Sequence, residues 1–154
     1  MTLLDTDTNS GSMLIACYAA VGDLQALARV AKMTLSRAET TLKQDPNNAA
    51  AIGYGANALA AQGDSQRFKE WMKRALALEP DNIKSRYNFA CAMARLKESE
   101  AALELLEPIF ENISIGLLNH AKADPALDLL RNDPKFTAIV KAADARLAAM
   151  AKRS

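Results

Sequence analysis

The sequence has few of the residues that build disulfide scaffolds, metal sites or catalytic centres. Cys17 and Cys91 are its only cysteines, and His120 is its only histidine. Disulfide-rich domains and structural zinc sites need several such residues at short spacings. A Cys91 nucleophile activated by His120 would need a turn to expose the thiol, and Cys91 lies within a helical pattern. We therefore expect two buried, reduced thiols, a surface or interhelical histidine, and no catalytic, cofactor or metal site.

Long blocks of one charge and long apolar runs are also absent. The chain has 19 basic and 18 acidic residues and a formal net charge of +1, which excludes the basic surface typical of nucleic-acid-binding proteins. The longest apolar run, "MLIACYAAV" from Met13, is about half as long as a membrane span. The opening "MTLLDTDTNS" lacks the positive start of a signal peptide. These features predict a cytoplasmic protein that binds neither membranes nor nucleic acid.

Aromatic residues make up 5% of the chain and runs of β-branched residues are missing, so few stretches could form a sheet. Alanine is abundant instead, which favours helices. The fold class predicted from composition is all-α. Turn-formers next to helix-capping residues divide the chain into segments, beginning at Gly22-Asp23 and Asp45-Pro46-Asn47. We expect a flexible leader over residues 1–11 and one domain over residues 12–151.

One pattern occurs twice in the chain. "LKQDPNNAAA" begins at Leu42 and "LALEPDNIKS" at Leu76, which places two prolines 34 positions apart. The residues between them read as a helix, a Gly-Asp turn and a second helix, each with one apolar stripe at helical spacing. Neither helix pair could bury its stripe alone, so neighbouring pairs must stack. The predicted units span about residues 12–46, 49–82 and 83–113.

This 34-residue unit resembles the tetratricopeptide repeat, with Ala56 at the small-residue position, Gly63 in the inner turn, Ala75 as the late alanine and Pro80 as the terminal proline. The phrases "GYGANALAAQGD", "RYNFACAMARL" and "ALELLEPIF" resemble the repeat region of bacterial proteins linked to class III adenylate or guanylate cyclases and to winged-helix regulators. No cyclase catalytic segment is present. The resemblance implies a right-handed α-solenoid of three helix pairs.

The segment "HAKADPALDLLRNDPKFTAIV" resembles a closing motif that follows the last repeat in such proteins. It predicts a capping segment over about residues 114–151. Asp124 and Asp133 can each cap a helix whose first residue is proline. Three apolar side chains of this segment are expected to plug the open end of the last repeat: Leu127, Leu130 and Phe136.

Three further features predict details of the helix packing. The distance from Gly22 to Pro46 exceeds that from Gly63 to Pro80 by about two helical turns, which predicts a long helix over Leu24–Lys43. Trp71 lies one residue from a core stripe and should pack between neighbouring units. Each glycine is costly inside a helix, so Gly53 and Gly55 predict a close backbone approach by a neighbouring helix or by a ligand.

In tetratricopeptide proteins the first helix of each pair lines a concave groove. When the ligand-facing positions of that family are carried over one by one, they place cationic, amide and aromatic side chains in the groove. On the first unit the matching face is rich in alanine. Such a surface suits a peptide or partner domain, preferably an acidic one. The candidate partner-binding residues are Gly53, Asn57, Lys84, Tyr87, Cys91 and Arg95.

The leading hypothesis is therefore a non-enzymatic protein-binding module in bacterial signalling or regulation. The alternative is an oligomerisation segment, or an intramolecular regulatory segment of a larger signalling protein such as a cyclase. In that case the partner is another copy of the chain, forming a homo-oligomer, or an adjoining domain. The sequence leaves both hypotheses open.

Overall fold

The computed structural model describes residues 8–152, and every regular element in that range is a helix. The predicted all-α class is therefore correct. The first pair is α1 (Thr8–Val21) and α2 (Leu24–Gln44), the second α3 (Ala49–Ala61) and α4 (Ser65–Leu78), and the third α5 (Ile83–Arg95) and α6 (Ser99–Glu111). The chain continues through α7 (Ile115–Ala123), the 3-10 helix η2 (Pro125–Leu130) and α8 (Pro134–Ala151).

Local capping decides where most helices begin. The side chains of Asp23, Asn48 and Asp64 accept hydrogen bonds from backbone N–H groups three residues further on, which satisfies donors that a helix start leaves open. The tight turns inside the pairs need a left-handed residue. Gly22 and Gly63 supply it with φ of 74° and 77°, and Lys97 adopts φ of 62° at the corresponding place in the third pair.

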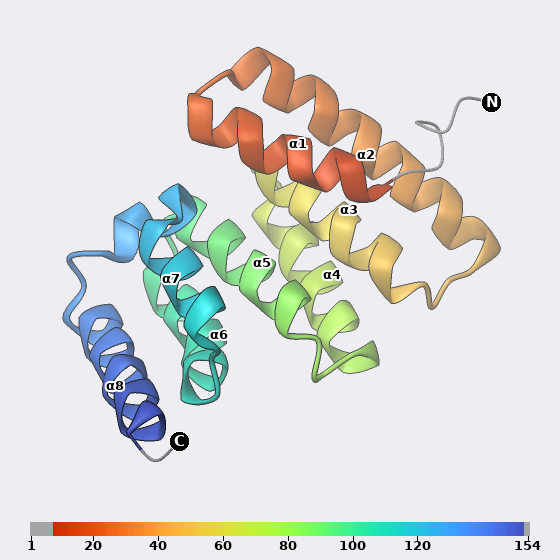
Figure 1. Cartoon of the computed structure of the whole chain (residues 1–154). Coiled ribbons are helices and arrows are strands. Elements are labelled where there is room, and N and C mark those ends of the chain that lie inside the picture. The colour runs from red at the N-terminus through yellow and green to blue at the C-terminus, as the bar shows by residue number, and fades with distance from the viewer. Residues whose placement is uncertain (1–7, 153–154) are drawn as a thin grey trace.

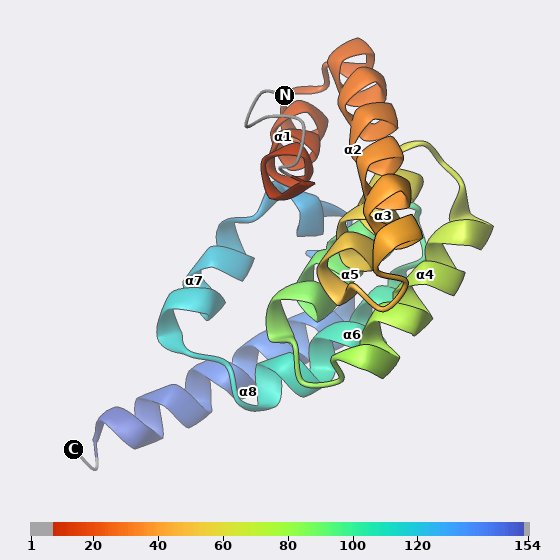
Figure 2. The same ribbon diagram turned by 90° about the vertical axis from the view of Figure 1, so that its right-hand side faces the viewer.

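The helix pairs pack in sequence order, and the first helices of the pairs lie side by side (Figures 1 and 2). Contacts join α1 to α3 and α3 to α5, while α2 packs on α3 and α4 packs on α5. The core between the second and third pairs contains Phe68 and Phe89, fully buried, whose ring centroids are 6.2 Å apart in an edge-on arrangement. Each pair therefore buries its apolar stripe against the next.

The long second helix is confirmed, since α2 covers Leu24–Gln44. The predicted leader is wrong at its end, because α1 already begins at Thr8; residues 1–7 lie outside the described part. The reason is tertiary contact. Gly11 is buried so closely against α2 that an added Cβ would lie 2.3 Å from Thr34 Oγ1, and Tyr54 donates a hydrogen bond of 3.1 Å to Asn9.

The expectation of two buried thiols is half wrong: Cys91 is buried, but Cys17 is exposed. In α1 the core-facing residues are Gly11 and Ile15. Two further positions along a helix turn the side chain by about 200°, so Cys17 points away from that core.

Two predictions about α3 and α4 have different outcomes. Gly55 does allow a close approach, because an added Cβ would lie 2.2 Å from Cζ3 of Trp71. Trp71 thus packs in the junction between helices, as expected. The same prediction is wrong for Gly53, where the nearest atoms, in Phe89 and Ser85, are 3.9 Å away at ordinary contact distance.

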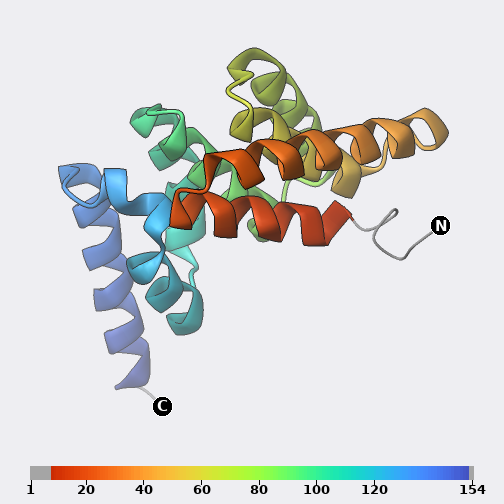
Figure 3. The same ribbon diagram turned by 90° about the horizontal axis from the view of Figure 1, so that it is seen from above.

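The C-terminal segment packs on two different parts of the fold. Helix α8 contacts α6, where Phe136 meets Phe110 edge-on at 6.2 Å. The short helix η2 instead crosses to the first helices and contacts both α5 and α1 (Figure 3). Leu127 and Leu130 are 0% exposed, so the predicted burial of the cap leucines is confirmed. The cap therefore spans the side of the molecule formed by α1 and α5.

Candidate binding site

A cavity of about 820 Å³ lies where the first helices of the pairs meet the capping segment. Its lining residues come from α1, α3 and α5 and from the capping elements α7 and η2, the second of which packs on α5. We call it the groove cavity. The wall from α1 consists largely of small side chains, among them Ser12, Ala16, Ala19 and Ala20.

The structure brings five of the six candidate residues to the groove cavity. Asn57 comes from α3, and the other four come from α5: Lys84, Tyr87, Cys91 and Arg95. Their spacing along α5 places them on one face, because residues three and four apart share a face of a helix. Gly53 does not line the cavity; it is buried where α3 faces Phe89 and Ser85 of α5.

Asn57 and Arg95 are two polar side chains of the cavity without protein partners. Asn57 is only 6% exposed, and its Oδ1 atom is buried with no hydrogen-bond partner. Arg95 is half-buried, makes no hydrogen bond or ion pair within residues 8–152, and burial lowers the pKa of its guanidinium. A buried polar atom without a partner costs about 1–3 kcal/mol, so a ligand that donated a hydrogen bond to the Asn57 oxygen would recover that energy.

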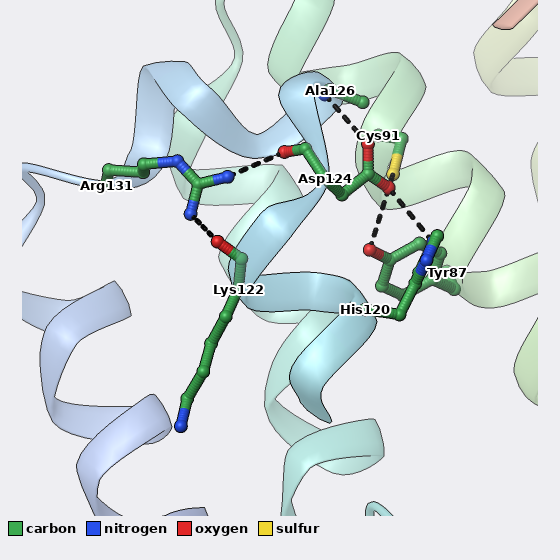
Figure 4. A network of polar contacts seen from close by, with 7 residues as sticks. All are labelled: Tyr87, Cys91, His120, Lys122, Asp124, Ala126 and Arg131. Atoms are coloured by element: carbon green, nitrogen blue, oxygen red, sulfur yellow. Dashed lines mark hydrogen bonds and ion pairs between the residues drawn. The ribbon is translucent and has the colours of Figure 1, made fainter. Parts of the chain in front are cut away.

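Asp124 connects the capping segment to α5, and both of its carboxylate oxygens accept hydrogen bonds (Figure 4). Its Oδ2 atom accepts a hydrogen bond of 2.9 Å from the Tyr87 hydroxyl and lies 3.8 Å from Cys91 Sγ. The His120 Nε2 atom is 3.5 Å from the same oxygen, and the ring of His120 lies against Tyr87 with centroids 5.8 Å apart. Oδ1 accepts from the backbone N–H of Ala126 and so caps η2.

Arg131 fixes the backbone around Asp124. Its Nη2 atom donates to the carbonyl of Asp124 at 2.9 Å, and its Nη1 atom donates to the carbonyl of Lys122 (Figure 4). Its Nε atom donates to Asp128 Oδ1 at 2.6 Å. The end of α7 and the start of η2 are thereby held together by one side chain, which sets the direction of the Asp124 carboxylate.

The environment of the Cys91 thiol opposes a nucleophilic role. Burial, together with the negative charge of Asp124, raises the pKa of Cys91 to about 12. The pKa of the Tyr87 hydroxyl is raised as well, chiefly by burial and then by its anionic neighbours. A thiol needs its thiolate form to attack, and activated cysteines have lowered pKa values. Cys91, His120 and Asp124 do converge, but burial and the charge of Asp124 favour the protonated thiol of Cys91, which is the unreactive form.

Other chemistries find little support in this part of the chain. Residues 8–152 contain no group of three or more His, Cys, Asp or Glu side chains that could hold a metal ion. None of the helices described is both long enough and apolar enough to cross a membrane. What the cavity offers is unsatisfied polar groups in an apolar enclosure, which is the composition of a binding pocket.

The sequence alone did not reveal the wall formed by the capping segment. Asp124 was predicted to cap a helix, which it does, but its contact with Tyr87 joins residues 37 positions apart. His120 was expected at the surface or between helices; it is exposed and also lines the cavity. The Asp-Pro pair marks a helix start, and no local pattern indicates which distant helix the segment will touch. A search of protein-family models found no match to this chain, and no curated protein matched its sequence.

Proposed function

We propose that this chain is a non-enzymatic binding module that holds a short segment of a partner protein in the groove cavity. The observation that carries this proposal is the Asn57 oxygen, which is buried without a partner in the wall of a cavity of about 820 Å³. Natural proteins rarely leave a buried side-chain acceptor unsatisfied unless water or a ligand reaches it. A peptide backbone has N–H donors that could do so.

The cavity is lined by two cations and two carboxylates, but the carboxylates of Asp124 and Asp128 already accept hydrogen bonds, whereas the cations are unpaired within the described residues, which supports an acidic segment as the partner. Arg95 has no anionic partner within hydrogen-bonding reach, and the exposed Lys84 lies at the same cavity. The resemblance to tetratricopeptide repeats supports a protein partner at this site, because that family uses the matching helix faces to bind partners. We place the protein, on the same grounds, in bacterial cytoplasmic signalling or regulation.

A comparison of two matched triple variants tests the proposal. The groove variant carries Asn57→Ala, Lys84→Ala and Arg95→Glu. The control variant carries Gln25→Ala, Arg29→Glu and Lys32→Ala, which removes the same charges from exposed positions of α2. Peptides selected from a random display library on the wild-type protein should bind the groove variant at least about tenfold more weakly and the control unchanged.

Circular dichroism and thermal unfolding of both variants establish that any loss of binding does not reflect unfolding. The proposal is wrong if the selected peptides bind both folded variants as tightly as the wild type, or if selection enriches no peptide. Either result would mean that the groove cavity does not recognise peptide segments.

A second candidate function is self-association, and one observation favours it. The first helix pair exposes several large apolar side chains, including Met13, Val21 and Leu24, the last two 76% and 73% exposed. The first unit of a helical repeat normally has a polar outer face. Light scattering over a concentration series should then show a mass that rises with concentration, and Val21→Lys with Leu24→Lys should abolish the rise. A constant monomer mass would exclude this candidate.

A further inference from the structure

The capping segment changes the kind of ligand that the groove cavity can take. An open concave groove lets an extended peptide pass from one end to the other. Here η2 contacts both α1 and α5 and so lies across one end of the first helices (Figure 3). The volume of about 820 Å³ lies within the range of about 300–1,000 Å³ that is usual for small-molecule pockets. The enclosure therefore favours a short ligand over a long chain.

The walls of the cavity are mostly apolar. The apolar part of its lining includes Ile15 and the alanines of α1, Leu117 of α7 and Pro125 of η2. Small side chains on α1 leave room for the body of a ligand, and an apolar body would gain free energy from each methylene removed from water. This half of the site requires a hydrophobic group.

The two unsatisfied polar groups define the other half of the ligand. The Arg95 guanidinium offers only donors, so it requires an acceptor, preferably an anion. Two carboxylates line the same cavity, but the oxygens of Asp124 already accept from Tyr87 and Ala126, and Asp128 is paired with Arg131. Asp124 attracts Arg95 without forming an ion pair with it. The Asn57 oxygen, in contrast, requires an N–H or O–H donor.

We propose that the groove cavity binds a small amphipathic acid of the N-acyl amino acid type, with its carboxylate on Arg95, its amide N–H on Asn57 and its acyl chain along the alanine wall of α1. This inference goes beyond the proposed function, since it assigns a small-molecule class of ligand to the same cavity. The carboxylate and the neighbouring N–H together distinguish this ligand from a simple fatty acid. The volume of the cavity distinguishes it from a long peptide.

The test measures binding of four probes to the intact chain by titration calorimetry. N-octanoylglycine has both polar groups, N-octanoylglycinamide lacks the charge, and N-octanoylsarcosine lacks the N–H. The fourth probe is a polar decapeptide with a free C-terminal glycine. We expect N-octanoylglycine to bind about tenfold or more tightly than the amide, about fivefold more tightly than the sarcosine derivative, and at least tenfold more tightly than the decapeptide. Lengthening its chain by one methylene should improve binding about fourfold.

Variants assign these preferences to the two residues. Arg95→Met should remove the preference for acid over amide and keep that for glycine over sarcosine, and Asn57→Leu should do the reverse. Arg86→Met removes the same charge from α5 at a residue that bonds the carbonyl of Pro80 and does not line the cavity, so it should bind like the wild type. Circular dichroism identifies any variant that fails to fold. The comparison of the four probes on the wild-type protein tests the inference even in that case.

The inference is overturned if N-octanoylglycine gives no heat at millimolar concentration, if the amide or sarcosine probe binds equally well, or if the decapeptide binds as tightly. If the small probes do not bind, but selected peptides still bind the wild type more tightly than the groove variant, only this inference is overturned. Tight binding of N-octanoylglycine without any selected peptide would overturn only the proposed function.

Discussion

Substituting the two glycines of α3 by alanine should change the stability of the protein in opposite directions, although they lie only two residues apart. At Gly55 a Cβ atom would lie 2.2 Å from Cζ3 and 2.8 Å from Cε3 of Trp71, and 3.1 Å from the Cβ of Ala38. At Gly53 the nearest atoms are 3.9 Å away. Both positions are buried within one helix, so the helix propensity of the new alanine is the same in each.

The magnitudes follow from these distances. Alanine is favoured over glycine inside a helix by about 1 kcal/mol, and Gly53→Ala should realise most of that gain. Overpacking a filled core costs about 1–3 kcal/mol, and the indole ring of Trp71 cannot bend away as a flexible side chain could. The contact of 2.2 Å places this cost in the upper part of the range, about 2–3 kcal/mol, so after subtraction of the helix-propensity gain we expect Gly55→Ala to lower the free energy of unfolding by about 1–2 kcal/mol. In a chain of this size that is a fall of roughly 2–8 °C in Tm.

Urea and thermal unfolding followed by far-UV circular dichroism measure both changes, and the fluorescence of Trp71, the only tryptophan, reports displacement of its ring. A double-mutant cycle gives the decisive result. On a Trp71→Leu background the clash is gone, so Gly55→Ala should become neutral or stabilising. If Gly55→Ala stabilises the otherwise wild-type protein as Gly53→Ala does, or if the cycle shows no coupling, the packing argument at this junction is refuted.

The remaining predictions concern the two thiols and the left-handed residues of the turns. At pH 8 a disulfide reagent should modify Cys17 quickly and Cys91 only after unfolding. Cys17 is exposed, whereas the raised pKa of about 12 leaves Cys91 protonated. Rapid modification of both thiols in the native protein would contradict this. The pKa of Cys91 is higher in the folded than in the unfolded chain, so folding favours the protonated thiol. Its contribution to the free energy of unfolding should be complete below pH 9 and be lost as the pH rises toward 12. In the Cys91→Ala variant this contribution to the alkaline loss of stability should be absent. Lys97 adopts φ of 62°, so Lys97→Gly should stabilise the chain by about 1 kcal/mol. The gain should appear as a higher urea midpoint with an unchanged m-value. Gly63→Ala, at φ of 77°, should destabilise the chain instead. A lower midpoint for Lys97→Gly would contradict the strain argument.

Much of the secondary structure could be predicted because its signals are local. The start of α2 follows from Asp23, which caps it, and the end follows from the Asp-Pro pair after Gln44. The third turn shows the limit of such signals. Lys97 keeps the left-handed turn that glycine makes in the earlier pairs. Glu98 stands at the N-cap of α6, but its side chain makes no capping hydrogen bond and contacts Ser65 and Lys69 of α4 instead.

The parts that could not be predicted depend on contacts between distant residues. The start of α1 at Thr8 depends on how Gly11 fits against Thr34, and the exposure of Cys17 depends on which face of α1 the other helices cover. Candidate residues on α5 could be chosen by helical spacing, because a single helix orders them. The wall from the capping segment could not, since nothing near Asp124 in the sequence identifies Tyr87 as its partner.

The position of Asp124 couples the stability of the cap to the properties of the groove cavity. One carboxylate caps η2 through Ala126 and bonds Tyr87 across the cavity wall. The same carboxylate attracts Arg95 but forms no ion pair with it, so the donors of Arg95 remain available in a cavity whose lining is largely apolar. The same residue thus fixes the capping segment and leaves Arg95 unpaired, so a ligand that pairs with Arg95 does not have to break the contact between the cap and α5.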